Sequence, residues 1–269
     1  MKSTNRKVSI LWQIWSDRKL LFGLARNDFK SRFANSFLGV VWAYVQPLVT
    51  MLVFWYVFQV GLRNSNIDSY PFIVWYAPAF LVWTFFADTL SSMTNSLMEY
   101  SYLVKKVNFN VAIIPSVKLL SGIFVHTAFL VFIVVLNCVY HIPLSVYYLQ
   151  VFYFFFCTVA LLFAQGMLFA AIMPFFGDMS NLVGVILQVG FWATPIVWNS
   201  DTVTENVRRL LSYNPMYYIC NGYRDSFLFH VGFWEQPIQG VTFWVTTLLT
   251  MWLGLSLFRK LRSDFVDVM

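Results

Sequence analysis

The sequence has few charged residues and lacks the common motifs of nucleotide-binding and hydrolytic enzymes. Of its 269 residues, 11% are charged, whereas soluble domains average about 25%. No Gly-Lys dipeptide occurs, so the chain has no Walker A loop to hold the phosphates of ATP, and no Gly-x-Ser-x-Gly elbow occurs either. We therefore expect a protein that is not an enzyme and that binds no cofactor of its own.

Residues that bind metals or form disulfides are equally scarce. The histidines and cysteines are His126, His141, His230, Cys138, Cys157 and Cys220. The histidines have no metal-ligand spacing and the cysteines form no paired motif, so the sequence predicts neither a metal site nor a disulfide framework. The cysteines fit buried small hydrophobic residues instead.

Long apolar segments predict an all-α membrane protein whose single helical domain fills residues 1–269. Hydrophobic residues make up 59% of the chain, and a helix needs roughly 20 apolar residues to cross a bilayer. Six transmembrane helices are predicted, at Leu38–Leu62, Pro71–Leu97, Leu119–Tyr140, Tyr147–Met173, Asn181–Trp198 and Gly240–Phe258. No cleavable signal peptide is expected, because the basic N-terminal segment lacks a long apolar region and a small-residue cleavage site.

Between the fifth and sixth predicted spans, residues 199–239 are expected to form an outer re-entrant gate region. Asn214–Arg224 is apolar and aromatic, but it is too short to cross a membrane and is interrupted by Asn221 and Gly222. Such a segment can enter a membrane and return when protein shields its backbone from lipid. We interpret it as lining the mouth of a pore.

The N-terminal segment, residues 1–36, is predicted to lie on the cytosolic face as an interfacial helix. Its basic residues alternate with apolar patches, and Trp12 and Trp15 favour the membrane interface over a solvated basic tail. A break at Ser16-Asp17 is expected to divide the segment into two helices, because Asp can cap the second one.

The distribution of positive charge predicts that both termini are cytosolic. Of the 18 Lys and Arg residues, four fall on one side of the predicted spans, namely Arg63, Arg208, Arg209 and Arg224, and all the others fall on the opposite side. Basic residues accumulate in cytosolic loops of membrane proteins. The positive net charge therefore reflects membrane topology, and nucleic acid is not expected as a partner.

One carboxylate, Asp88, falls in the second half of the second predicted span. An ionisable residue at membrane depth indicates a functional role, and the alternative is that the helix is already leaving the bilayer there. Few other carboxylates fall at membrane depth, which disfavours a proton or sodium relay. If the protein transports something, its energy is expected to come from a partner.

Aromatic residues make up 20% of the chain. Interface belts account for those at the span ends, and core packing is the alternative for each single residue. Aromatic rings also offer flat surfaces on which a sugar face can slide without tight binding. We predict a substrate path lined by Phe54, Trp55, Phe191 and Trp192, with Tyr217 and Tyr218 at its outer gate.

Ordered sequence marks over nearly the whole chain resemble those of ABC-type polysaccharide and polyol-phosphate export permeases, which move O-antigens, capsules and wall teichoic acids. The marks are Arg32-Phe-Ala-Asn-Ser-Phe-Leu-Gly-Val-Val-Trp-Ala-Tyr-Val-Gln-Pro47, Lys105-Lys106 with Phe109 and Pro115, Phe176-Gly-Asp178, Trp192-Ala-Thr-Pro-Ile196 and Asn214-Pro215. The resemblance implies export of a lipid-linked polysaccharide or teichoic acid polymer across the bacterial cytoplasmic (inner) membrane.

The same resemblance implies the partners. It predicts a homodimer of this chain with two copies of a separate ATP-binding subunit, which would hold ATP and Mg²⁺. It also implies that Lys105, Lys106 and Phe109 belong to a helix that couples to this subunit, and that gate helices follow Pro195. Two alternatives remain open: a sister permease for a small drug or lipid, expected to have a shorter and less aromatic pathway, and a membrane-embedded acyltransferase, which would need a His/Asp or paired-carboxylate site.

Overall fold

The long apolar segments form a bundle of helices whose backbone hydrogen bonds are satisfied within each segment, as a lipid environment requires. The computed structural model describes residues 10–32, 36–61, 66–67, 69–106 and 109–269. The helical elements are α1 (Ile10–Ser16), α2 (Arg18–Ser31), η1 (Gly39–Val41), α3 (Trp42–Trp55), η2 (Tyr56–Gly61), α4 (Phe72–Glu99), α5 (Ser101–Val104), α6 (Ile113–Val139), η3 (Val146–Gln150), α7 (Val151–Ile172), α8 (Met179–Ala193), η4 (Ser200–Thr202), α9 (Glu205–Leu211), α10 (Pro215–Arg224), η5 (Asp225–Phe229), η6 (Phe233–Glu235), α11 (Pro237–Leu261) and α12 (Phe265–Val268). A short antiparallel hairpin, β1 (Asn66–Ile67) with β2 (Tyr70–Pro71), precedes α4.

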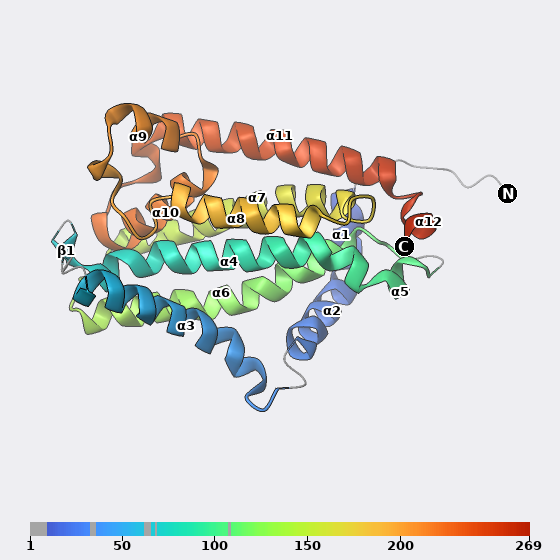
Figure 1. The fold of residues 1–269 in the computed structure, drawn as a ribbon, viewed down its shortest axis with the longest axis horizontal. Helices are drawn as coiled ribbons and strands as arrows, with labels where there is room; N and C mark the ends of the chain where they lie inside the picture. The colour runs from blue at the N-terminus through green and yellow to red at the C-terminus, as the bar shows by residue number, and fades with distance from the viewer. Residues whose placement is uncertain (1–9, 33–35, 62–65, 68, 107–108) are drawn as a thin grey trace.

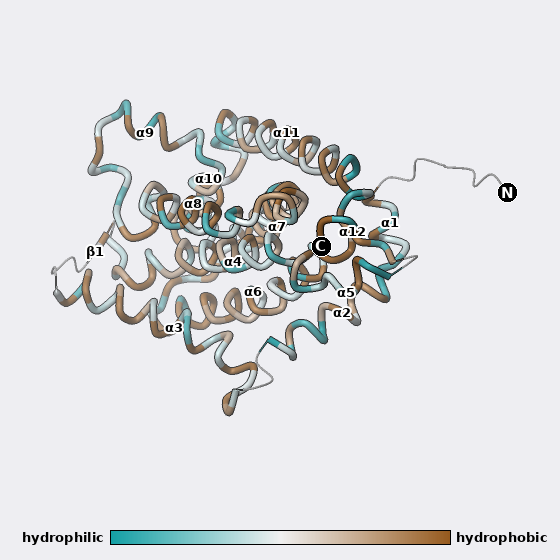
Figure 2. Tube along the Cα trace, turned by 45° about the vertical axis from the view of Figure 1, so that its right-hand side comes forward, coloured by the Kyte–Doolittle hydropathy of each residue, from teal (hydrophilic) through white to brown (hydrophobic). Residues whose placement is uncertain are grey.

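Five helical segments of the described chain are long and apolar enough to cross a membrane, which confirms an all-α membrane protein. They are Gly39–Gly61, Phe72–Glu99, Ile113–Val139, Val146–Ile172 and Pro237–Leu261. They correspond to the first four predicted spans and the last one. Hydrophobic residues run along the length of these helices, and hydrophilic ones gather near α2 and α9 (Figure 2).

The fifth predicted span, Asn181–Trp198, is wrong in its extent. The helix there, α8, has 15 residues and ends at Ala193, so it is about 22 Å long against a hydrocarbon layer of about 30 Å. The reason is local: Thr194 precedes Pro195 and adopts an extended backbone with φ −98° and ψ 131°. A residue before proline is driven out of the helical region by a clash with the proline ring.

Helix α4 is the centre of the bundle, and most of its side chains are buried between α6, α7, α8 and α10 (Figure 1). Small residues let α7 approach its neighbours closely. Gly166 of α7 lies against Met93 of α4, and Gly254 of α11 lies against the backbone of Ala164. Close backbone approach through small residues is the usual basis of helix association in lipid.

In contrast, α3 and α8 leave much of their surface uncovered. Leu52 and Val53 of α3 are exposed, as are Val185 and Val189 of α8. Helix α3 contains Pro47 and continues into the π-helical turn η2. Cys157 and Cys220 are buried, as expected. Cys138 is exposed on α6, so the expectation that all three cysteines are buried is wrong for this residue.

One end of the bundle collects the helices at both ends of the described chain, α1, α2 and α12, together with α5 (Figure 1). The expected break is confirmed, because α1 ends at Ser16 and α2 begins at Arg18. Asp17 does not cap α2 with its side chain. Its carboxylate instead accepts a hydrogen bond of 3.1 Å from Asn110. A second apolar cluster, formed by Ile10, Leu97, Val104, Val111, Ala112, Ile114, Met167, Ala170, Ala171, Phe258 and Phe265, holds this end together.

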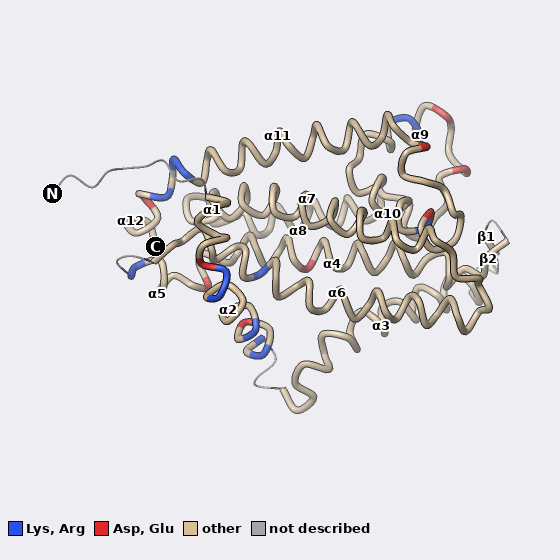
Figure 3. The backbone as a smooth tube through the Cα atoms, turned by 180° about the vertical axis from the view of Figure 1, so that it is seen from behind, with Lys and Arg blue, Asp and Glu red and all other residues tan. Residues whose placement is uncertain are grey.

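The opposite end contains the hairpin, α9 and α10. Charged residues concentrate at the two ends, and few lie along the long helices (Figure 3). Helix α9 is polar and carries Arg208 and Arg209, which pair with Glu205. In contrast, α10 is largely buried against α4, α7 and α11. The chain between α8 and α11 therefore contains an exposed helix and a buried one.

Candidate functional site

A cavity of about 600 Å³ separates the loosely packed α3 from α4 and α6, and Phe191 of α8 contributes to its wall. Its lining contains both aromatic and polar side chains. Aromatic lining residues are Trp42, Phe54, Phe80, Trp83, Phe85, Phe129 and Phe191. Polar lining residues include Arg32, Gln46, Thr50, Thr84, Asp88, Ser91 and Ser92. The cavity can therefore contact both the apolar faces and the polar groups of one ligand.

The aromatic wall is assembled from three helices. The rings of Phe54 on α3 and Phe191 on α8 have centroids 5.6 Å apart, and Trp83 of α4 lies 6.1 Å from Phe191. Gly190 makes the approach of α8 possible, since a Cβ atom at this position would lie 2.9 Å from the ring of Trp83. The sequence predicted Phe54 and Phe191 as path residues, and both line this cavity.

The other two membrane-embedded aromatics of the predicted path lie elsewhere. Trp55 is half-buried, and its Nε1 donates a 2.6 Å hydrogen bond to Oε1 of Gln59 one turn later. Trp192 is 55% exposed, and its carbonyl accepts a hydrogen bond from Nε1 of Trp198. Neither residue lines the cavity within this single chain, so their role in the path stays a prediction.

The two predicted gate tyrosines are buried in α10. The hydroxyls of Tyr218 and Tyr153 lie 3.2 Å apart, and Tyr217 donates a 3.4 Å hydrogen bond to Ser200. In this conformation the tyrosines join the outer segments to the bundle. Their gate role stays a prediction, and it would require these contacts to open.

Arg224 fixes the outer segments, a role that is not among the sequence predictions. It is buried, and its guanidinium lies 3.6 Å from the ring centroid of Trp75 in α4. It donates hydrogen bonds to the carbonyls of Trp75 (3.1 Å), Pro195 (2.8 Å) and Ile196 (2.8 Å). A planar guanidinium with several donors is suited to such a junction. The available signal was an arginine ending an apolar, aromatic stretch.

A second contact explains why two of the sequence marks occur together. Asn214 caps α10 by accepting a 3.0 Å hydrogen bond from the amide of Met216, and its side-chain amide donates at 2.9 Å to the hydroxyl of Thr194. The segment around Thr194-Pro195 and the Asn214-Pro215 dipeptide are thus parts of one junction at the outer end.

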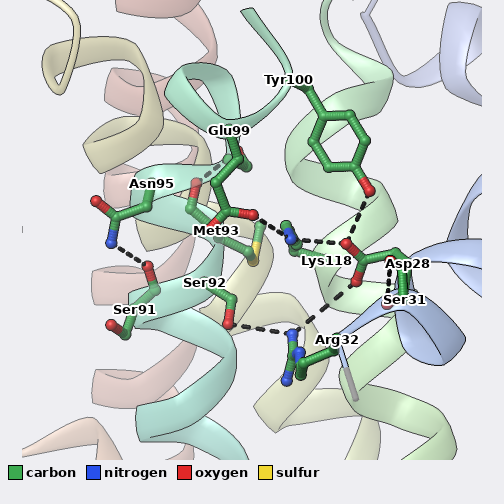
Figure 4. Close-up of polar contacts among 11 residues, drawn as sticks. Asp28, Ser31, Arg32, Ser91, Ser92, Met93, Asn95, Glu99, Tyr100 and Lys118 are labelled. Atoms are coloured by element: carbon green, nitrogen blue, oxygen red, sulfur yellow. Dashed lines mark hydrogen bonds and ion pairs between the residues drawn. The ribbon is translucent and has the colours of Figure 1, made fainter. Parts of the chain in front are cut away.

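An ion-pair network fastens α2 to the bundle near the polar end of the cavity (Figure 4). Lys118 of α6 contacts the carboxylates of both Asp28 (2.6 Å) and Glu99 (2.5 Å). The Tyr100 hydroxyl donates to Asp28 at 2.8 Å. Arg32 donates to Ser92 at 3.2 Å and lies 3.9 Å from Asp28. The side chains of Asp28 and Lys118 are buried, whereas half of Glu99 is exposed.

This network keeps Asp28 ionised. Burial disfavours its charged form, but the hydrogen bond and the charge of Lys118, with a further hydrogen bond from Tyr100, outweigh burial and lower the pKa of Asp28 below its ordinary value. For Tyr100, burial and the neighbouring Asp28 carboxylate both raise the pKa of the phenol. Asp28 therefore meets Lys118 as a carboxylate at neutral pH.

Comparison with known proteins decides the family. Residues 19–228 match the family model described as ABC-2 type transporter. The chain belongs to the ABC-2 type transporter family. It is 25% identical over 270 residues to the O-antigen export system permease protein RfbA of Myxococcus xanthus, covering 97% of this chain and 99% of that protein. It is 28% identical over 263 residues to a protein of the same name from Klebsiella pneumoniae, covering 93% and 95%.

Family membership indicates where in the cell the chain lies and what class of partner it has. ABC-2 family members of this kind are membrane subunits of transporters in the bacterial inner membrane, and an ATP-binding subunit accompanies them. This agrees with the five long apolar helices of the described chain. It also agrees with a sequence that has no ATP-binding loop.

The three residues predicted to couple to an ATP-binding subunit lie at the end of the bundle that carries α5. Lys105 and Lys106 are exposed directly after α5. Phe109 is half-buried and packs against the second apolar cluster, which also contains residues of α1, α11 and α12. The assignment of these three residues to a coupling helix stays a prediction. Through Val104 and Phe109, this segment packs against the same apolar cluster as residues of α1, α11 and α12.

Proposed function

We propose that this ABC-2 family chain is the membrane subunit of an exporter that carries a lipid-linked polysaccharide outward and is powered by a separate ATP-binding subunit. The observation that carries the proposal is the divided cavity between α3 and α4, with rings on one part of its wall and polar groups on another. It occurs in a chain similar over nearly its whole length to proteins named O-antigen export permeases. A sugar polymer has the apolar faces and hydroxyl groups that such a wall accommodates.

The proposed topology has six crossings with both termini in the cytosol. Helix α8 would be the fifth and shortest crossing, completed by the extended residues that follow it. The chain direction alternates along α3, α4, α6, α7, α8 and α11, and α2 and α12 lie at the same end of the bundle (Figure 1). The buried α10 and the turn η5 would form the re-entrant part of the outer gate region, residues 199–239.

The proposed assembly is a homodimer with two ATP-binding subunits, which would hold ATP and Mg²⁺. The uncovered apolar faces of α3 and α8 support the proposal that a second copy of the chain packs at that side of the cavity. The predicted path residue Trp192 also lies on an uncovered face, where this second copy could cover it. Lys105, Lys106 and Phe109 would contact the ATP-binding subunit. This chain itself would bind no cofactor and catalyse no reaction.

The proposed path begins at the cavity. Phe54 and Phe191 would offer rings to the sugar faces, Trp55 and Trp192 would continue the path in the dimer, and Tyr217 and Tyr218 would close its outer end. Beyond the cavity, ring contacts favour movement, because a sugar released from one ring can bind the next without breaking strong hydrogen bonds.

The test is reconstitution of this chain with its ATP-binding subunit in proteoliposomes loaded with lipid-linked polymer from the host. The proposal expects ATP-dependent transfer of the polymer across the bilayer, with no transfer when the partner's Walker A lysine is replaced. The isolated chain should bind no ATP. Transport of small drugs without any polymer transfer would contradict the proposal, and so would nucleotide binding by this chain alone.

A further inference from the structure

Asp88 lies at membrane depth and not at the end of its helix. Helix α4 has 28 residues and is about 42 Å long, which exceeds a hydrocarbon layer of about 30 Å. Asp88 stands eleven residues before Glu99, the last residue of α4, or about 16 Å from that end. A layer centred on α4 therefore contains Asp88. A charge at this depth is costly, which indicates that the side chain has a use.

The carboxylate of Asp88 is exposed on the cavity wall. Among the described residues it makes no hydrogen bond or ion pair, in contrast to Asp28, whose partners are Lys118 and Tyr100. The cation that shares the cavity wall, Arg32, donates to Ser92 and lies 3.9 Å from Asp28, and its charge also attracts the Asp88 carboxylate without a direct contact. Asp88 is thus a hydrogen-bond acceptor directed at the space that the proposed substrate would enter.

Two threonine hydroxyls that line the same cavity are also acceptors toward it. The hydroxyl of Thr50 donates its proton to the carbonyl of Gln46 at 3.0 Å, and the hydroxyl of Thr84 donates to the carbonyl of Phe80 at 2.9 Å. Both hydroxyl oxygens therefore offer the cavity lone pairs and no proton. Together with the Asp88 carboxylate, these two oxygens can accept hydrogen bonds from a ligand that brings several donors, as the hydroxyl groups of a sugar do.

We propose that Asp88, with Gln46 and Thr50 lining the same cavity from α3, forms a subsite that binds the hydroxyl groups of a sugar residue of the exported polymer. This assignment rests on the proposed function and deepens it. The rings of Trp83 and Phe191 lie in the same wall and can contact the apolar face of that sugar while the carboxylate accepts from its hydroxyls. The subsite would select for a glycan over an unglycosylated lipid at the start of the path.

The experiment compares two radiolabelled probes on the complex with its ATP-binding subunit, held in nanodiscs. One probe is the lipid-linked polymer isolated from cells that lack the ATP-binding subunit, and the other is undecaprenyl phosphate, which carries no sugar. Asp88→Asn keeps the shape of the side chain and removes its charge. Hydrogen bonds to a charged acceptor contribute enough that we expect the Kd for the polymer to rise ten- to a hundredfold, with no change for undecaprenyl phosphate.

Two further variants complete the design. Asp267→Asn makes the same chemical change at an exposed residue of α12, outside the cavity, and should alter neither Kd. Thr50→Val keeps the size of an exposed side chain on the opposite helix, removes its acceptor and should weaken polymer binding several-fold. Thr50→Val also serves as the decisive variant if Asp88→Asn does not assemble.

The proposed subsite is contradicted if Asp88→Asn binds the polymer as tightly as the unaltered complex does, or if the affinities for both probes fall equally. It is also contradicted if the only change in the variant is loss of the dimer in cross-linking. Unchanged polymer binding by Thr50→Val would also contradict it. These results differ from a failure of the proposed function, in which the unaltered complex itself binds no lipid-linked polymer.

Discussion

Replacing Lys118 with Met should detach α2 from the bundle more effectively than any other single change in the ion-pair network. The ammonium of Lys118 contacts Asp28 at 2.6 Å, and both side chains are buried. Removing one partner of a buried pair leaves the other charge unpaired and typically costs about 3–5 kcal/mol. We therefore expect the free energy of unfolding of Lys118→Met to fall by this amount.

The second ion pair of the network, between Lys118 and Glu99, should contribute less to the free energy of unfolding. The Glu99 side chain is 50% exposed, although it lies 2.5 Å from Lys118. Water can solvate Glu99 when its partner is absent, and such pairs contribute about 1 kcal/mol or less. Glu99→Gln should therefore be nearly neutral. The double variant Asp28→Asn/Lys118→Met should recover part of the loss, because it buries no unpaired charge.

The assay is reversible unfolding of the purified chain by SDS titration in mixed micelles, combined with protease cleavage near α2. The reasoning predicts the largest loss for Lys118→Met, partial recovery in the double variant and little effect of Glu99→Gln, with cleavage near α2 following the same order. An equal loss in Lys118→Met and Glu99→Gln would refute it, as would a double variant less stable than Lys118→Met.

Three further outcomes are expected. Arg224→Gln should lower the free energy of unfolding by at least about 2 kcal/mol, because buried carbonyls lose charged donors. The same variant should expose residues 199–214 to protease. Unchanged stability and protease protection would contradict the role of Arg224 in joining the outer segments to the bundle. Charge reversal of Lys105 and Lys106 should reduce substrate-stimulated ATP hydrolysis in the complex while insertion stays normal, and equal hydrolysis would remove their coupling role. The pKa of Asp28 is lower in the folded chain than its ordinary value of 3.8. The contribution of its carboxylate to stability is therefore complete above pH 3.8 and is lost as the pH falls below 3.8 through the folded pKa. Helix α2 should become protease-sensitive only below pH 3.8, and Asp28→Asn should lack this transition.

Much of the helical architecture could be predicted from the sequence, because apolar length and proline positions act locally. The break at Ser16-Asp17 and the small residues of α7 are examples, since each depends on neighbours within a few residues or on one helix face. The end of α8 could also have been predicted from Pro195, whose ring constrains Thr194. The prediction that the helix continues to Trp198 is wrong, because the proline ends the helix although the apolar sequence runs on.

Contacts between distant segments could not be predicted from one sequence. Helix periodicity gives no absolute rotation, so it could not separate Phe54, which lines the cavity, from Trp55, which bonds Gln59. Arg224 was counted only as an outer basic residue, because its three carbonyl acceptors come from α4 and from the segment after α8. Asp88 was ambiguous until the full length of α4 placed it well inside the helix.

The most direct test of the account is the rate of ATP-driven export of lipid-linked polymer by Phe54→Ala and Phe191→Ala, measured at equal amounts of inserted, ATPase-bound complex. Trp252→Ala is the matched control, because this ring is 66% exposed on α11 and does not line the cavity. The account predicts that both cavity variants lose at least about tenfold in export rate, which corresponds to about 1.4 kcal/mol, while Trp252→Ala keeps the full rate. Full-rate export by both cavity variants would contradict the claim that the polymer passes along this cavity.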